Sequence, residues 1–293
     1  MSNSVLTNSS ALMALQNLNR TNERLTDVQS RINTGLKVQG AKDNASIWAI
    51  AQNQRADMGA LEAVTTSLNR ATSIADVSLA AGESISDLLI ELKKIATAAA
   101  DPSATDESRR AYNDEFQSLL TSITSFARNA TFDGENILDN SQTTPLNFLA
   151  DADASQPITI GRLNFTLEGL GLITPASADY DPGPPVVGTP AAPVNVLELG
   201  DAETTLGLVS TALAAVSTGL AQLGAQAKQI ESHTIFVSKL RDALETGIGN
   251  LVDADMAKES ARLQALQVQQ QLGAQALSIA NQAPQIILSL FRN

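Results

Sequence analysis

An apolar stripe in the second half of the chain most limits the folds that this sequence can adopt. Between Leu206 and Leu251, positions spaced alternately by three and four residues are apolar at twelve of fourteen places, which makes seven heptads of a coiled-coil seam. A matching stripe runs from Leu61 to Ala99. A helix over residues 203–251 would be about 74 Å long, whereas a compact domain of this chain length would measure about 50 Å across. The sequence therefore predicts a mainly α fold, an elongated rod of long antiparallel helices that pair as a coiled coil.

Small and branched apolar side chains supply the predicted core of this rod. Aromatic residues make up only 3% of the chain, so the helices can approach one another closely. Arg241 is the one charged position in the seam, and the sequence leaves open whether it interrupts the coiled coil or pairs with an acid across it. We assign the rod core to Leu61, Leu68, Leu89, Leu92, Leu213, Leu220, Leu223, Ile230 and Leu244.

Proline placement separates helical ends from a middle of different structure. Eight of the ten prolines lie between Pro145 and Pro193, and proline breaks helix interiors. Helices are therefore expected over residues 4–33, from about 43 to 100, and from about 105 to 129.

Local signals predict the caps and turns. We expect Gly35 to cap the first helix, Asp43 the second, and Asp253 and Asp255 the last one. Asp133-Gly134 predicts a turn. In the middle of the chain, Ile158–Ile160 and Leu163–Leu167 flank Gly161-Arg162 and predict a small β-hairpin, and residues 181–193 predict an exposed loop rich in proline and glycine.

The terminal helices carry apolar residues on more than one face. In the first helix, Leu15, Leu18, Leu25 and Ile32 share one line, with Leu12 and Val28 off it. The last helix has one stripe of Met256, Leu263, Leu266, Leu277 and Ala280, and a second of Ala261, Ala265, Val268, Leu272, Ala276 and Ile279. A helix on a single core needs one apolar face, so the second face predicts an association surface. The alternative is that both ends fold back into one buried bundle, and the pattern alone leaves both open.

Charge and composition exclude several classes of function. The net charge of −12 argues against nucleic acid or an anionic membrane surface as a partner. The chain has no cysteine and one histidine, His233, so we expect no enzyme activity, no cofactor and no metal site. The uncharged run 263–291 is long enough to span a bilayer, but its eight glutamines argue against a membrane segment. The first residues also lack the pattern of a secretory signal peptide.

Three segments resemble the bacterial flagellin family. They are Ser-Arg-Ile-Asn-Thr-Gly-Leu-Lys-Val from Ser30 with Ala-Lys-Asp-Asn-Ala-Ser from Ala41, Ala-Thr-Phe-Asp-Gly-Glu-Asn-Ile-Leu at 130–138, and Ala-Asn-Gln-Ala-Pro-Gln-Ile-Ile-Leu-Ser-Leu-Phe-Arg at 280–292. The segments occur in the family's order, and the resemblance covers about 200 residues at the two ends. The short middle is similar to that of small flagellins.

The resemblance implies a structural subunit of the flagellar filament, exported unfolded and assembled outside the cell. Residues 1–35 and 255–293 would form an inner domain, residues 36–140 and 201–254 the rod, and residues 141–200 a variable, partly β, outward-facing insertion. The implied partners are further copies of the chain, the flagellar cap and hook–filament junction proteins, an export chaperone and the type III export apparatus. A hook–filament junction protein with flagellin-like ends is the alternative. Two more distant alternatives are an enzyme on a helical scaffold and an exported coiled-coil effector or adhesin.

Residue assignments follow from the same resemblance. Members that activate the mammalian Toll-like receptor carry a basic residue where Glu91 stands, so we expect weak recognition here. Possible O-glycosylation sites are Ser141, Thr143, Thr144 and Thr189. We assign self-assembly to Leu12, Leu15, Leu18, Leu25, Val28, Ile32, Leu263, Leu266, Val268, Leu272, Leu277, Ile279, Ile286, Leu288, Leu290, Phe291 and Arg292.

Overall fold

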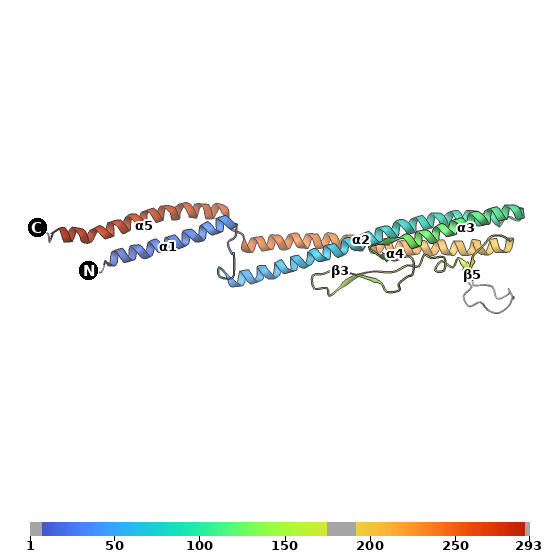
Figure 1. The fold of residues 1–293 in the computed structure, drawn as a ribbon, viewed down its shortest axis with the longest axis horizontal. Helices are drawn as coiled ribbons and strands as arrows, with labels where there is room; N and C mark the ends of the chain where they lie inside the picture. Colours follow the sequence, from blue (N-terminus) through green and yellow to red (C-terminus); the bar gives the residue numbers. More distant parts are fainter. Residues whose placement is uncertain (1–7, 175–191, 291–293) are drawn as a thin grey trace. The chain divides into compact units, whose positions relative to one another are not determined.

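The computed structural model describes residues 8–174 and 192–290. Within these ranges the chain forms five helices, with three two-stranded sheets between the third and fourth helices (Figure 1). The helices are α1 (Ser9–Thr34), α2 (Ala45–Ala99), α3 (Asp106–Asn129), α4 (Leu199–Val252) and α5 (Met256–Leu290). The predicted mainly helical fold with a small β region is confirmed.

The chain divides into two compact units. One, the end unit, contains α1, α5, the start of α2 up to Met58 and the end of α4 from Asp242; the other, the middle unit, lies between Gly59 and Arg241. The end unit has its own small core, in which Val38 and Ala51 pack with Ile248 and Val252, and Trp48 covers part of it.

Two of the four predicted caps are confirmed. Gly35 ends α1 with φ of 72°, a left-handed conformation that favours glycine, and its N–H donates to the carbonyl of Arg31 at 2.8 Å. Asp255 caps α5, since its carboxylate accepts from Lys258 N at 3.1 Å.

Two expected caps are wrong. Asn44 rather than Asp43 caps α2, because the Asn44 side chain accepts from Ile47 N, while Asp43 accepts from Gln39 N in the preceding turn. Asp253 does not cap α5 either; it forms an isolated β-bridge with Leu36.

The seam of the middle unit is buried as a continuous stripe. All twelve α2 stripe positions from Leu61 to Ala99 are buried, and every α4 seam position is buried or half-buried. The two helices lie side by side, and a Cβ at Gly82 on α2 would come 2.5 Å from Leu220 on α4 (Figure 1). By length and composition α4 is apolar enough to cross a membrane, but its seam residues in the middle unit are buried or half-buried within the protein.

The predicted core leucines do not all reach the same depth. Half-buried members are Leu213, Leu220 and Leu244; buried members are Leu61, Leu68, Leu89, Leu92, Leu223 and Ile230. The third helix adds Phe116, Leu120, Ile123 and Ala127 to the buried set, at the same alternation of four and three residues.

The β region differs from the predicted hairpin. Strand β4 (Pro157–Ile160) pairs with β3 (Leu146–Leu149), in antiparallel register with Leu146 opposite Ile160, and not with residues 163–167. The remaining strands are β1 (Thr131–Phe132) with β2 (Glu135–Asn136), joined at the predicted Asp133-Gly134 turn, and β5 (Ile173–Thr174) with β6 (Ala192–Pro193). The predicted loop 181–193 lies outside the described residues except for its last two, which form β6.

Candidate self-assembly surface

Helices α1 and α5 pair antiparallel in the end unit (Figure 1). Polar contacts mark both ends and the centre of the pair. Asn8 Nδ2 donates to the carbonyl of Ala280 at 2.7 Å, and Gln270 Nε2 donates to Asn22 Oδ1 at 2.8 Å. At the other end, Arg31 lies 3.7 Å from the carboxylate of Glu259.

One face of α5 lies against α1. Its half-buried positions recur at heptad spacing, and they are Leu263, Leu266, Gln270, Gly273, Leu277 and Ala280. The helices approach closely at Gly273, where an added Cβ would lie 3.2 Å from Leu18 Cδ1. Met256, which the sequence placed on this stripe, is 43% exposed instead.

The matching face of α1 differs from the predicted line. Leu18, Leu25 and Ile32 are half-buried as expected, but Val28 is the most buried residue of the helix at 6% exposure. Leu15 is exposed and lies outside this face together with Leu12. The grouping of Leu15 with the inner line and Val28 off it is therefore wrong. The inner face follows alternate steps of three and four residues, which place Val28 between Leu25 and Ile32 and place Ala14, not Leu15, before Leu18.

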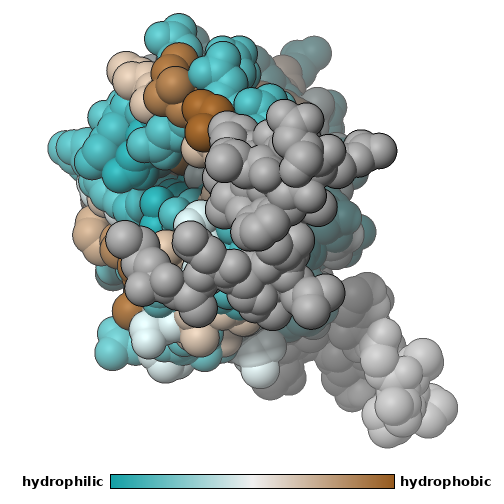
Figure 2. All heavy atoms as spheres, turned by 90° about the vertical axis from the view of Figure 1, so that its left-hand side faces the viewer, coloured by the Kyte–Doolittle hydropathy of each residue, from teal (hydrophilic) through white to brown (hydrophobic). Residues whose placement is uncertain are grey.

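The outer face of the pair leaves large apolar side chains in solvent. On α5 these are Val268, Leu272 and Ile279, which are 55%, 59% and 68% exposed. On α1 they are Leu12, Met13 and Leu15. Figure 2 shows hydrophobic side chains that reach the surface among hydrophilic ones. Together these six residues define the outer stripe, whose α5 members fall on the predicted second apolar face.

Charge is confined to one end of α5. Glu259 is buried, and its Oε1 contacts Arg262 at 2.8 Å and Arg31 at 3.7 Å. From Leu263 onward α5 has no ionisable side chain. A helix face without charge can be buried without the large desolvation cost that an ionised group would impose.

The structure places the other predicted site residues as follows. Ser141, Thr143 and Thr144 are exposed, and Thr189 lies outside the described residues. In α5, Ile286, Leu288 and Leu290 belong to the helix, whereas Phe291 and Arg292 also lie outside the described part of the chain. Glu91 is half-buried and accepts a hydrogen bond from Lys94 at 2.8 Å, which raises the pKa of Lys94.

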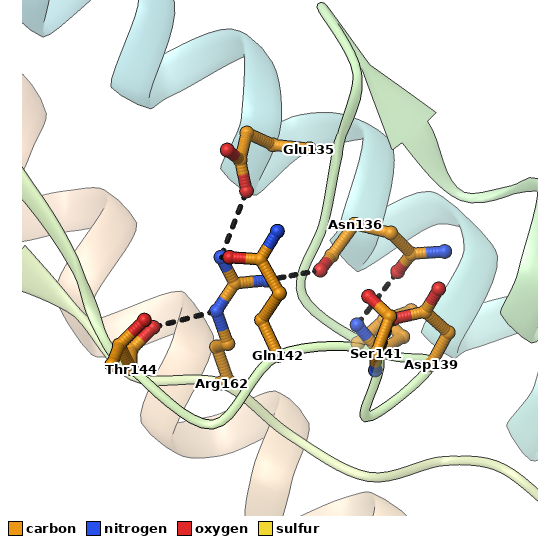
Figure 3. A network of polar contacts seen from close by, with 8 residues as sticks. Glu135, Asn136, Asp139, Ser141, Gln142, Thr144 and Arg162 are labelled. Atoms are coloured by element: carbon orange, nitrogen blue, oxygen red, sulfur yellow. Dashed lines mark hydrogen bonds and ion pairs between the residues drawn. The ribbon is translucent and has the colours of Figure 1, made fainter.

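Two residues that the sequence did not single out hold the insertion in place. Arg162 donates to the carbonyls of Thr144 and Asn136, at 2.7 Å and 2.6 Å, and pairs with Glu135 at 2.8 Å (Figure 3). The second residue is Phe165, which is 3% exposed and fits where α2 and α4 carry glycines.

Sequence reasoning also missed a group of exposed apolar side chains on α4. They are Ile235, Phe236 and Leu240, and none of them is a seam position. The sequence feature that could have revealed them is the occurrence of large apolar residues outside the heptad stripe, in a stretch that is otherwise polar. Among the described residues no group of three or more histidine, aspartate or glutamate side chains is arranged to hold a metal ion.

This fold defines a class, the mainly helical proteins built from long antiparallel helices. Flagellin FljM of Caulobacter vibrioides is 50% identical over 290 residues, which cover 99% of both chains. The sequence profiles of the bacterial flagellin N-terminal and C-terminal helical regions match residues 5–143 and 206–291. The chain belongs to the bacterial flagellin family.

Further comparisons agree with this assignment. A flagellin of Brucella melitensis is 41% identical and covers 99% of each chain. A putative flagellar hook-associated protein from Vibrio parahaemolyticus has a TM-score of 0.55 at 11% identity, over 72% of this chain and 100% of that one, which shows the fold alone. The protein is accordingly a structural subunit of the extracellular flagellar filament.

Proposed function

We propose that the outer stripe of α1 and α5 is the surface through which copies of this flagellin assemble into a filament. One observation carries the proposal: α5 has two apolar faces and α1 covers only one of them. Burying a Val, Leu or Ile side chain fully is worth about 1.5–3 kcal/mol. Three such side chains on α5, each more than half exposed, give assembly a driving force that the isolated subunit does not use.

The proposed division of labour follows the predicted segments. Residues 1–35 and 255–293 would form the inner layer of the filament, residues 36–140 and 201–254 the rod, and residues 141–200 the outward-facing insertion. The exposed hydroxyls of Ser141, Thr143 and Thr144 then suit O-glycosylation, because a bulky glycan on an outward segment would not obstruct assembly.

Export and the remaining partners are part of the same proposal. The chain would leave the cell unfolded through a type III apparatus, with a chaperone on the C-terminal segment, and would add at the tip beneath the cap protein. Absence of cysteine supports this route, since no disulfide can form in transit between compartments of different redox potential. We also propose a purely structural, non-enzymatic role. The relatives reported above are flagellins over their full length, which favours the filament over the hook–filament junction.

Seeded assembly of two charged variants tests the proposal. Leu272→Glu places a carboxylate on the outer stripe, and Gln271→Glu places the same charge on the adjacent exposed residue in an isosteric change. Monomers are added to sheared filament ends, and the pellet is measured by sedimentation and examined by electron microscopy. Leu272→Glu should remain soluble, because an ionised group buried between copies costs several kcal/mol. Gln271→Glu should form long helical tubes.

Monomer controls separate assembly from folding. Both variants should keep the helical circular dichroism of the wild-type monomer, since residue 272 is exposed there. Normal filaments from Leu272→Glu would refute the role of the outer stripe. Rings or soluble dimers from the wild type would favour the junction protein instead.

A further inference from the structure

The middle unit exposes apolar side chains of its own. Ile235 is 51% exposed, Phe236 56% and Leu240 36%, and we call these three residues the α4 patch. The neighbouring seam positions 234, 237 and 241 are buried or half-buried. Because helix geometry directs the seam toward α2, the α4 patch cannot join the core of its own unit.

The α4 patch is held in place by a contact from the β region. His233 Nε2 lies 2.6 Å from the carbonyl oxygen of Ala150, which directly follows β3. A carbonyl can only accept, so Nε2 carries the proton and donates it. The imidazole ring lies 5.7 Å from the Phe236 ring at an interplanar angle of 45°. Contact with the hydrogen-bonded imidazole restricts the motion of the Phe236 ring. Less conformational entropy is then lost when a partner binds it.

The small area of the α4 patch limits what can cover it. Fully burying a phenylalanine covers about 150–250 Å², so three side chains that are about half exposed present on the order of 300 Å². Stable complexes of free proteins bury about 1,200–2,000 Å² in total. A soluble partner would gain too little from this surface to bind on its own. A second copy of the chain, already held by contacts elsewhere, meets the patch at a high effective concentration.

We propose that the α4 patch is a second contact between copies in the filament. It rests on the proposed function, because the terminal helices must first bring the copies together. In an open helical polymer each contact joins two different surfaces. The patch therefore meets a different surface of the neighbouring copy and not the same residues of its partner.

Single-cysteine labelling tests this contact in a chain that has no cysteine of its own. Phe236→Cys probes the patch, and Thr143→Cys, exposed on the insertion, is the matched control. Each variant is copolymerised in trace amounts with excess wild type, and maleimide labelling rates are compared between monomer and pelleted filament. The thiol of the Phe236→Cys variant should react quickly in the monomer and at least about tenfold more slowly in the filament. The thiol of the Thr143→Cys variant should react at similar rates in both.

Each outcome decides a different question. Fast labelling of the Phe236→Cys variant inside filaments would overturn the proposal, and slow labelling in the monomer would mean that the chain covers the patch itself, which also overturns it. Failure of the wild type to form filaments would instead overturn the proposed function. If the Phe236→Cys chains alone are excluded from growing filaments, the patch is needed for incorporation, which supports the contact.

Conservative and polar substitutions give a second measurement. Phe236→Ser should raise the monomer concentration at which filaments form by roughly tenfold or more, because the buried aromatic area is lost. Phe236→Leu should stay within about threefold of the wild type, since it keeps most of that area. Equal behaviour of the two variants would contradict the proposal. The helical circular dichroism of both monomers should match the wild type.

Discussion

Arg162 connects the insertion to β2, which follows α3, with one planar side chain. Its guanidinium reaches the carbonyls of Asn136 and Thr144 and the carboxylate of Glu135, and only 6% of the side chain is exposed. Asn136 in turn donates to the carbonyl of Ala127, within the last turn of α3. A rigid fork of five donors suits several fixed acceptors at once, which a lysine could not satisfy in the same geometry.

Removing this guanidinium should weaken the fold of the middle unit. We expect Arg162→Met to lower the free energy of unfolding by about 2–4 kcal/mol, because it removes the donor to the carbonyl of buried Asn136 and to the carboxylate of Glu135, which is 24% exposed. Urea denaturation of the monomer measures the change. Arg70→Met is the matched control, since Arg70 pairs with Asp133 at the surface with side chains 46% and 63% exposed. It should cost less than about 1 kcal/mol, and equal losses would contradict the network.

Asp151 makes a local prediction for acid pH. The hydrogen bond from Ser155 Oγ, at 2.6 Å, is the largest cause that holds the pKa of Asp151 below its ordinary value, and backbone N–H donors add to it. A carboxyl with a lowered folded pKa stabilises the folded state above its unfolded pKa, and this contribution is lost as pH falls through the folded pKa. Ser155→Ala should therefore raise the pKa of Asp151 toward the unfolded value. Carbon-13 NMR titration of the carboxyl measures it, and no upward movement would refute the assignment.

Among the secondary-structure elements, the helices were predictable and the β region was not. The seam recurs over seven heptads, so single exceptions such as Thr234 or Arg241 do not obscure its period. Strand signals in the insertion span only three to five residues, and residues 163–167 alternate as well as true strands do. What decides the pairing lies elsewhere in the sequence, because the backbone N–H groups of Leu163 and Phe165 donate to the carbonyls of Ile137 and Leu138, at 2.7 Å and 2.8 Å, and not to β4.

The candidate site shows a similar limit. Two apolar faces on α5 could be read from the sequence, since no charge interrupts them. The face of α1 was assigned wrongly, because steps of seven from Leu18 pass over Val28, which lies between Leu25 and Ile32 on the same face. The α4 patch was missed because its apolar residues look like core residues by composition. Only their positions, which fall outside the seam, show that they face solvent.

Two glycines make room for Phe165, and they give a prediction for the packing of the insertion on the helices. A Cβ at Gly219 would lie 2.9 Å from Phe165 Cζ, and one at Gly82 would lie 3.2 Å from Phe165 Cε2. Gly219→Ala should destabilise the monomer by about 1–3 kcal/mol, because the buried ring has to shift. Gly224→Ala on the same helix meets nothing within 4 Å and should stabilise it by about 0.5–1 kcal/mol through helix propensity. Urea unfolding compares the two, and stabilisation by both would refute the docking of Phe165.

For the molecule as a whole, the net charge belongs to the middle unit alone. The stretches that form the end unit, 1–58 and 242–293, contain nine basic and nine acidic residues, whereas 59–241 contains ten basic and 22 acidic ones. The terminal helices can therefore associate without net repulsion between copies. The middle units repel one another wherever copies come close, and this repulsion opposes the apolar contacts that assemble the filament.

Assembly should consequently depend on ionic strength in a defined direction. Raising sodium chloride from 0.01 M to 0.15 M shortens the Debye length from about 30 Å to about 8 Å, which screens middle units from one another. The monomer concentration at which filaments form should fall over this range, as measured by sedimentation. Sucrose at matched osmolarity is the control, because it leaves charge unscreened. A variant with Glu62, Glu83 and Glu203 replaced by Gln, three exposed positions of the middle unit, should need less salt for the same effect. If the threshold were independent of salt, or rose with it, repulsion between the middle units would not limit assembly.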